Sequence, residues 1–118
     1  MASQKVHNVS YLAHVTLDLS QATTKAVILP KGAQVVQVSL EVTEPSDSGA
    51  KLDLGFEGSV DVIANDINIE QVGVNICNVA LEPKQNLELL ATSTGTTKGK
   101  AILRVLYFLP SVISVEIH

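Results

Sequence analysis

Three side chains of the kinds found in serine hydrolases, Ser10, His14 and Asp18, occur at intervals of four residues in this 118-residue chain. A hydrolase needs the serine hydroxyl, the imidazole and the carboxylate within hydrogen-bonding distance of one another. The residues around them alternate between apolar and polar, which predicts a strand, and four residues of a strand span about 13 Å. We therefore expect these side chains to share a solvated face, too far apart to form a triad.

The histidines and the single cysteine are the other side chains that could bind a metal or attack a substrate. His7 and His14 are separated by an odd number of residues, so they point to opposite faces of one strand, and His118 is the last residue. Cys77 lies among apolar residues, where burial raises the pKa of a thiol and makes it unreactive. We expect no catalytic residue and no cofactor. A lone cysteine also excludes an intramolecular disulfide and is typical of a reducing compartment.

Alternating oxygen donors at Asp66, Asn68 and Glu70 begin like a calcium-binding loop. The EF-hand also requires a glycine at its sixth position and a glutamate at its twelfth, and this chain has neither. A looser calcium site, completed by Asp61 or Glu57, stays open as an alternative. The simpler interpretation is that these residues form the polar side of a short strand or loop.

The segment 93–100, Ser-Thr-Gly-Thr-Thr-Lys-Gly-Lys, superficially resembles a phosphate-binding loop. The P-loop spacing is absent and no amphipathic helix follows, so we predict a hairpin loop between two strands. Lys98, Lys100 and Arg104 fall on one face and could meet an acidic partner. With 12 acidic against 8 basic residues, a net charge of −4 and no basic run, binding to nucleic acid is not expected.

The elements that must position these residues are strands, and one of them is predicted to be central. Val36, Val38, Leu40 and Val42 alternate with polar residues up to Thr43, as in a strand with one buried face. The sequence Pro30-Lys31-Gly32 before it predicts a tight corner, because proline fixes its own φ and glycine can adopt a positive φ.

The remaining strands follow from the same alternation and from turn-forming residues between them. Residues 59–73 are open to three interpretations: two short strands, one strand with an irregular loop, or a helical turn at 61–65. Either face of 74–81 could be buried, whereas 100–109 is apolar on both faces and should be covered on both sides. The other predicted strands are 9–19, 25–29, 52–56 and 87–91.

Strands about ten residues apart, without a helical period, predict an all-β antiparallel β-sandwich, jelly-roll-like or Greek key. Valine, isoleucine, leucine and alanine dominate the 46% hydrophobic content, and only 3% of residues are aromatic. Residues 1–118 are expected to form one domain, with 1–8 as an N-terminal arm. The segment 111–118 is expected to be a strand that pairs either within its own sheet or with a neighbouring subunit. Its alternating Ile113, Val115 and Ile117 are the predicted interface residues.

The N-terminus lacks the continuous apolar segment of a signal peptide, and no window approaches the ~18 apolar residues of a membrane span. Export through a signal peptide and contact with a membrane are therefore not expected.

The sequence Leu29-Pro30-Lys31-Gly32-Ala33, continued by the valine and leucine alternation to Thr43, resembles small virion proteins of tailed bacteriophages and prophages. Leu54-Gly55, the segment 95–99 and Tyr107-Phe108-Leu109-Pro110 agree with this resemblance, which covers about 15–110. It implies a β-sandwich that decorates or stabilises a capsid or forms the base of a head fibre. The implied location is the virion, after synthesis in the bacterial cytoplasm.

The physical features independently favour a non-enzymatic structural protein that forms a homo-oligomer. The expected form is a trimer, with the major capsid protein as a further partner. The alternative is a carbohydrate-binding or adhesin-like β-sandwich, which shares this architecture. The chain has no tryptophan and few aromatic rings, which disfavours the sugar-binding alternative.

Overall fold

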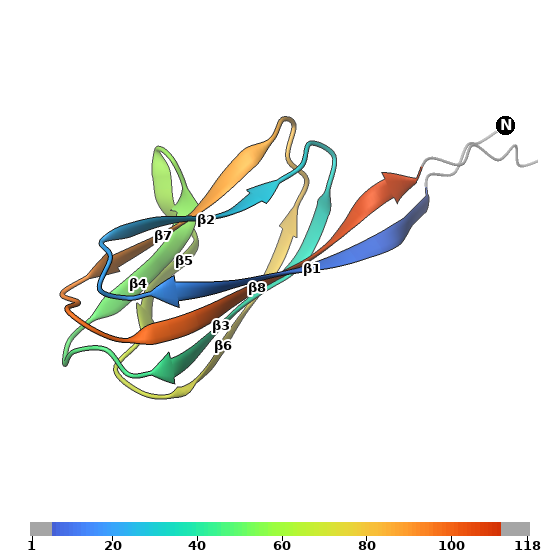
Figure 1. The fold of residues 1–118 in the computed structure, drawn as a ribbon. Coiled ribbons are helices and arrows are strands. Elements are labelled where there is room, and N and C mark those ends of the chain that lie inside the picture. The colour runs from blue at the N-terminus through green and yellow to red at the C-terminus, as the bar shows by residue number, and fades with distance from the viewer. Residues whose placement is uncertain (1–5, 112–118) are drawn as a thin grey trace, which may run out of the picture.

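Residues 6–111 are described by the computed structural model, with side chains described for 10–77 and 79–109. This part of the chain consists of strands joined by turns and short loops, and every strand is antiparallel to its neighbours (Figure 1). The strands are β1 (Val6–Asp18), β2 (Thr23–Leu29), β3 (Gln34–Glu44), β4 (Lys51–Phe56), β5 (Ser59–Asn68), β6 (Gly73–Leu81), β7 (Leu87–Thr94) and β8 (Lys100–Ser111).

The strands form two four-stranded sheets that lie face to face (Figure 1). The first has the order β1-β8-β3-β6 and the second the order β2-β7-β4-β5. Only β4 and β5 are consecutive strands that pair with each other, so every other connection crosses from one sheet to the other. The predicted all-β antiparallel sandwich is confirmed, and this strand order is compatible with a jelly roll.

The core lies between the sheets and is aliphatic. β3 is an interior strand between β8 and β6, as predicted for the central strand, and its inward side chains are fully buried. The corner before it also forms as predicted: the Ala33 N–H donates to the Pro30 carbonyl at 3.1 Å, and Gly32 has a φ of 81°. The largest fully buried side chains are Leu17, Leu19, Leu29, Val35, Val38, Leu40, Val42, Leu52, Leu54, Ile69, Leu89 and Leu103.

The prediction that Val36 faces the core is wrong. Val35 is completely buried, whereas Val36 is 36% exposed. Val35 pairs with Tyr107 and Gln37 pairs with Leu106, so β3 has one more residue than β8 at this point. This β-bulge shifts the alternation by one residue, which explains how both Val35 and Val38 face inward.

β5 resolves the three interpretations of the segment after Gly58. It is one strand with irregular pairing to β4, and residues 61–65 belong to it and do not form a helical turn. The register shifts on both sides of Leu54, and the backbone of Ser59 and Val60 lies against Gly55. A Cβ on Gly55 would lie 2.2 Å from the Ser59 carbonyl oxygen, so this approach requires a residue without a side chain.

β6 buries only one of its two apolar faces. Cys77, Val79 and Leu81 pack against the core, while Val74 and Ile76 are more than half exposed. The strand lies at the edge of its sheet and is covered by the second sheet on one side only. Among the described residues of β6, the outward apolar side chains are therefore left at the surface.

The expectation that β8 is covered on both sides is wrong for the single chain. Its inward residues, including Leu103 and Val105, are buried, but Ile102, Leu106 and Phe108 are only half-buried. β8 lies between β1 and β3 within one sheet, and the other sheet packs on one of its faces. The opposite face, which also carries Arg104, is not covered by the second sheet, and its apolar side chains stay partly exposed in the described part of the chain.

Four connections lie at the same end of the sandwich, which we call the loop end. The strands that precede them, β1, β3, β5 and β7, all run toward this end. The connections are 19–22, 45–50, 69–72 and 95–99. The last of these was predicted to be a hairpin, and that prediction is wrong. β7 and β8 lie in different sheets, so 95–99 crosses between the layers.

Hydrogen bonds join these connections to one another. The Leu19 N–H donates to the Gly99 carbonyl at 3.0 Å, and the Ser46 N–H donates to the Ile69 carbonyl at 2.9 Å. The Ser46 hydroxyl donates to the Lys98 carbonyl at 2.7 Å, which links 45–50 to 95–99. Polar groups of neighbouring loops thus satisfy one another, and the loop end is a connected unit.

At the other end, β1 and β8 continue together past the sandwich as a two-stranded ribbon (Figure 1). β3 stops pairing with β8 at Gln34, which lies opposite Phe108, whereas the β1–β8 pairing continues until Val6 meets Ser111. Residues 6–8, predicted to belong to an N-terminal arm, are therefore part of β1.

Candidate functional site

The structure places Ser10, His14 and Asp18 on the outward face of β1. Their partners across the ladder are Phe108, Arg104 and Lys100, so the three residues are spread along the strand. Asp18 accepts hydrogen bonds from the hydroxyl and the N–H of Ser20, at 2.6 and 3.0 Å. These two bonds hold the pKa of Asp18 below its ordinary value, and the bond from the Ser20 hydroxyl has the larger effect. The carboxylate caps a turn and does not orient His14.

Asp66, Asn68 and Glu70 lie at the end of β5 and in the loop after it. The Asn68 side-chain oxygen accepts the Glu70 N–H at 2.8 Å, and a Glu70 carboxylate oxygen accepts the Gly49 N–H at 2.5 Å. Asp66 has a φ of 55°, and its N–H donates to Asp53. Within residues 6–111 no three His, Cys, Asp or Glu side chains gather as metal ligands. The calcium site stays a prediction.

Two of the three basic residues predicted to meet an acidic partner, Lys100 and Arg104, already have acidic neighbours. Arg104 lies 2.9 Å from Glu41, and both side chains are about one-third exposed. Lys100 lies 4.0 Å from Glu44. Because these charges are largely balanced on the surface of the sheet, they do not form a basic patch.

Cys77 is half-buried on the inward face of β6. Burial raises the pKa of its thiol, which disfavours the reactive thiolate. The other predicted contact residues, Ile113, Val115 and Ile117, lie outside the described residues.

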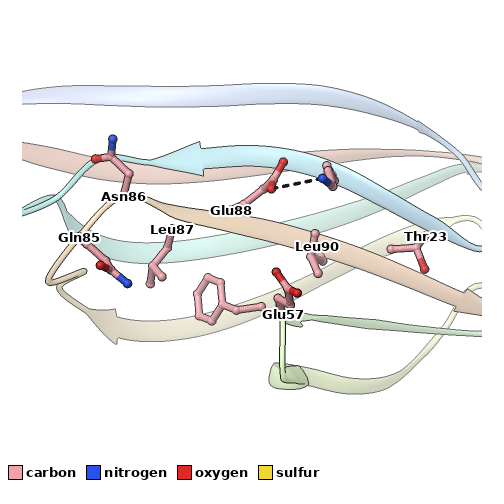
Figure 2. Close-up of a pocket in the computed structure, with 9 residues that line it drawn as sticks. Thr23, Glu57, Gln85, Asn86, Leu87, Glu88 and Leu90 are labelled. Atoms are coloured by element: carbon pink, nitrogen blue, oxygen red, sulfur yellow. Dashed lines mark ion pairs between the residues drawn. The ribbon is translucent and has the colours of Figure 1, made fainter.

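An open pocket of about 530 Å³ lies beside the β4–β5 turn (Figure 2). β2 and β7 contribute one wall, and the end of β4 and the turn before β7 contribute the rest. The lining residues are Thr23, Lys25, Phe56, Glu57, Gln85, Asn86, Leu87, Glu88 and Leu90. Sequence reasoning missed this pocket because its residues come from three separate segments, 23–25, 56–57 and 85–90, and no local spacing connects them.

The pocket combines an aromatic ring, side-chain amides and carboxylates. Lys25 lies 3.9 Å from Glu88 across its rim, and both side chains are substantially exposed. Asn86 accepts the Lys31 N–H at 2.9 Å, so its amide oxygen also holds the turn before β7 against the Pro30 corner. Phe56 is half-buried, whereas Glu57 and Gln85 are exposed. This set can bind a polar ligand but contains no nucleophile with an adjacent base.

Apolar side chains are exposed on the outward face of the first sheet. Leu12 is 60% exposed, and it lies opposite the half-buried Leu106. Ile76 is also 60% exposed and lies on the far edge strand. Exposed apolar side chains on a sheet face are typical of surfaces that contact other proteins. Residues 6–111 contain no helix that is long and apolar enough to cross a membrane.

These features define a class: an antiparallel β-sandwich with an aliphatic core and some exposed apolar side chains on its outer surface, suited to contacts with other proteins. No protein-family model matches the chain, and no curated protein has a significantly similar sequence. Solved structures do match. A chain in the acidic stable capsid structure of Helicobacter pylori bacteriophage KHP30 superimposes with a TM-score of 0.82 and 32% identity. The match covers 98% of this chain and 100% of that one.

Two further structures share the fold at lower identity. A chain of the cyanophage Pam1 capsid asymmetric unit has a TM-score of 0.68 and 16% identity, covering 86% of this chain and 85% of that one. A chain of the capsid of Ralstonia phage GP4 has a TM-score of 0.62 and 15% identity, covering 88% and 84%. Given the KHP30 match over the whole length of both chains, this chain belongs to the small structural proteins of bacteriophage virions.

Proposed function

We propose that this chain is a non-enzymatic protein that decorates or stabilises the capsid of a phage or prophage, or forms the base of a head fibre. The observation that carries the proposal is the 32% identity, over essentially the whole of both chains, with a chain from the KHP30 capsid structure. The exposed apolar side chains on the outward face of the first sheet, such as Leu12 and Ile76, support a role in protein contacts.

The proposed partners are the major capsid protein and further copies of this chain, with a trimer as the expected assembly. Homo-oligomers with closed symmetry are the usual form of such building blocks. The paired surface charges, Arg104 with Glu41 and Lys100 with Glu44, leave the outer face of the first sheet close to neutral. A neutral, partly apolar face can approach another protein surface at a lower desolvation cost than a charged one.

The test is deletion of the coding sequence from the phage or prophage that carries it, followed by purification of heads. We expect heads that lack the protein to be less resistant to heating, and the purified chain to bind them in saturable amounts, as measured by co-sedimentation. Tails purified without heads are the control and should not bind. Absence of the protein from wild-type virions, or the absence of saturable binding to heads, would contradict the proposal.

A second candidate function, carbohydrate binding, is favoured by the pocket alone. An aromatic ring with amides and carboxylates around it, as at Phe56, Gln85 and Glu57, is a set that can hold a sugar. A glycan array is the direct test. Saturable binding to a defined glycan that is lost on Phe56→Ala and kept on Ile28→Ala would support this candidate. The absence of any binding would leave the capsid role as the only proposal.

A further inference from the structure

β6 presents a free backbone edge. It pairs with β3 on one side and has no partner strand on the other side within the described part of the chain. Its pairing with β3 runs from Asn78 to Gly73 without a register shift, so this edge is regular. Its sequence contains no charged residue and no proline, which are the residues that commonly block an edge strand in natural proteins. Alternate N–H and C=O groups of β6 are therefore open to a further strand.

The other edge strands of the sandwich are irregular or have charged neighbours. β5 shifts its register against β4 twice, and β2 shifts its register against β7 beside Lys25. β1 is regular over most of its length, but Arg104 lies opposite His14 and Lys100 lies opposite Asp18 in its ladder. Among the four edges, β6 is therefore the one that combines a regular backbone with uncharged side chains.

Apolar side chains are incompletely covered on both faces of β6. On the inward face, Cys77, Val79 and Leu81 pack against the core but stay partly exposed, whereas the inward side chains of the neighbouring β3 are fully buried. On the outward face, Val74 and Ile76 are more than half exposed. A strand added beside β6 would cover side chains on both faces, because its own side chains alternate between the two faces.

The segment around β6 carries negative charge that the chain does not balance. Residues 52–83 contain six of the 12 acidic residues and no Lys or Arg. Within the described residues, every ion pair uses a carboxylate outside this segment. Asp61 and Asp66 lie on β5, the edge strand on the same side of the sandwich, Glu70 lies in the loop before β6, and Glu82 follows β6 directly. This side of the molecule is therefore suited to a positively charged partner.

The same charges decide between the possible occupants of the edge. A second copy that paired its own β6 with this one would bring two sets of the same carboxylates together, and they would repel each other. A strand with Lys or Arg side chains from another protein would place cations beside these carboxylates. The aliphatic stems of those side chains would also cover Val74 and Ile76, while their charged ends stay in water.

We propose that β6 is a docking edge for an extended basic segment of another protein, which adds to the first sheet as a fifth strand. Apolar side chains of the segment face inward beside Cys77 and Val79, and alternate with Lys or Arg side chains that face outward. Main-chain hydrogen bonds supply the affinity, and the alternation of side chains supplies the specificity. This inference goes beyond the proposed function, because it names a surface and its occupant and does not require that the occupant comes from a capsid.

The experiment uses a dye-labelled peptide that is as long as β6 and alternates lysine with valine. It is titrated with the full chain, and binding is measured by fluorescence anisotropy. A peptide that alternates glutamate with valine is the matched probe. We expect saturable binding of the lysine peptide that weakens as salt is added, and binding of the glutamate peptide that is at least about tenfold weaker. In NMR spectra, the amide shifts caused by the lysine peptide should lie in 73–77 and not in β1.

Ile76→Lys places a cation on the docking edge and should raise the dissociation constant of the lysine peptide at least about tenfold. Ile28→Lys is the matched control. Ile28 is 64% exposed, against 60% for Ile76, and lies on β2, the edge strand on the opposite side of the sandwich. The two substitutions change the net charge equally, so the control should bind the peptide far more tightly than Ile76→Lys. Val74→Lys is a second variant of the edge, with the same expected loss.

Far-UV circular dichroism confirms that each variant is folded. The inference is overturned if the wild type does not bind the lysine peptide, if it binds both peptides equally, or if folded Ile76→Lys binds as well as the wild type. A wild-type dimer that Ile76→Lys dissociates would assign the edge to a second copy and would also overturn it. Peptide binding is measured without phage heads, and head binding without the peptide. Failure of one test therefore leaves the other proposal standing.

Discussion

Two residues show how single positions hold this sandwich together. Gly55 permits the close approach of β5 to β4, and Asp47 joins two loops at the loop end by accepting hydrogen bonds from Thr97. Gly55 is present in the sequence without any local sign of its role. The contact that requires it is with Ser59, and the irregular pairing of β5 decides that contact.

Gly55→Ala is expected to destabilise the fold by about 1–3 kcal/mol, because the added Cβ would overlap the Ser59 carbonyl oxygen and the backbone must move. Urea denaturation measures the change in the free energy of unfolding. Ser59→Ala is the control: it keeps the backbone carbonyl and changes an exposed side chain, so it should be near neutral. Equal effects of the two substitutions would contradict this account of Gly55.

The pH dependence of stability should report the bonds at Asp47. The backbone N–H and the hydroxyl of Thr97 donate to this carboxylate, and these bonds lower its pKa from the ordinary 3.8. Because the pKa is lower in the folded state, the stabilisation is fully present above pH 3.8 and is lost as the pH falls through the folded value. We expect the contribution of Asp47 to the urea midpoint to stay constant from pH 7 down to about pH 4.5.

Asp47→Asn tests that expectation. It should lower the urea midpoint at pH 7, where the wild-type carboxylate is charged, and the difference from wild type should shrink below pH 3.8. Glu57→Gln, which changes an exposed carboxylate elsewhere, is the control. A difference between Asp47→Asn and wild type that is constant across the whole pH range would argue against the Thr97 bonds as its cause.

Among the strands, β3 shows the clearest agreement between the sequence pattern and the observed structure. Its alternation predicted a central strand, and it lies inside its sheet with Val38, Leu40 and Val42 completely buried. Val36 could not be placed from sequence, because a bulge depends on how many residues the partner strand supplies, and that partner, β8, is distant in the chain.

Leu40→Ala should reduce the free energy of unfolding by about 2–5 kcal/mol, because it leaves a cavity between the two sheets. Ile28→Ala removes an exposed aliphatic side chain and should change stability by no more than about 0.5 kcal/mol. Both values can be measured from urea denaturation curves. Similar losses for the two variants would show that Leu40 does not hold the layers together.

The candidate surfaces were less predictable than the strands. The sequence predicted that Ser10, His14 and Asp18 are spread along one face of one strand, and the structure places them so on β1, because strand spacing depends only on local geometry. It did not reveal that 95–99 crosses between the sheets or that one face of β8 is open, since both depend on which strands become neighbours. The pocket was missed for the same reason: Phe56 and Glu88 meet only after the sheet has formed.

The described part of the molecule is a long body, 61 Å by 26 Å by 17 Å, with the loop end and the two-stranded extension of β1 and β8 at opposite ends. The loop end is connected by hydrogen bonds between its own loops, whereas the opposite end consists of two strands that continue beyond the last pairing of β3 with β8. The loop end is therefore the more extensively connected of the two ends within one chain.

Hydrogen exchange should distinguish the interior of the first sheet from its edge. Amides of 38–42 in β3 should be protected, because β3 has partner strands on both sides in the same chain. Amides of 9–12 in β1, which has a partner strand on one side only, should on average exchange at least about tenfold faster. Equal protection of the two segments would contradict this difference between edge and interior strands.

The pairing of Val6 with Ser111 has a mechanical consequence. Two antiparallel strands that are pulled apart from one shared end open like a zipper, and the load falls on one ladder bond after another instead of on many bonds at once. A tether on either end of the chain would thus peel β1 from β8 at low force. A partner that holds this molecule under load would therefore keep it more firmly through contacts across its two sheets than through its chain ends.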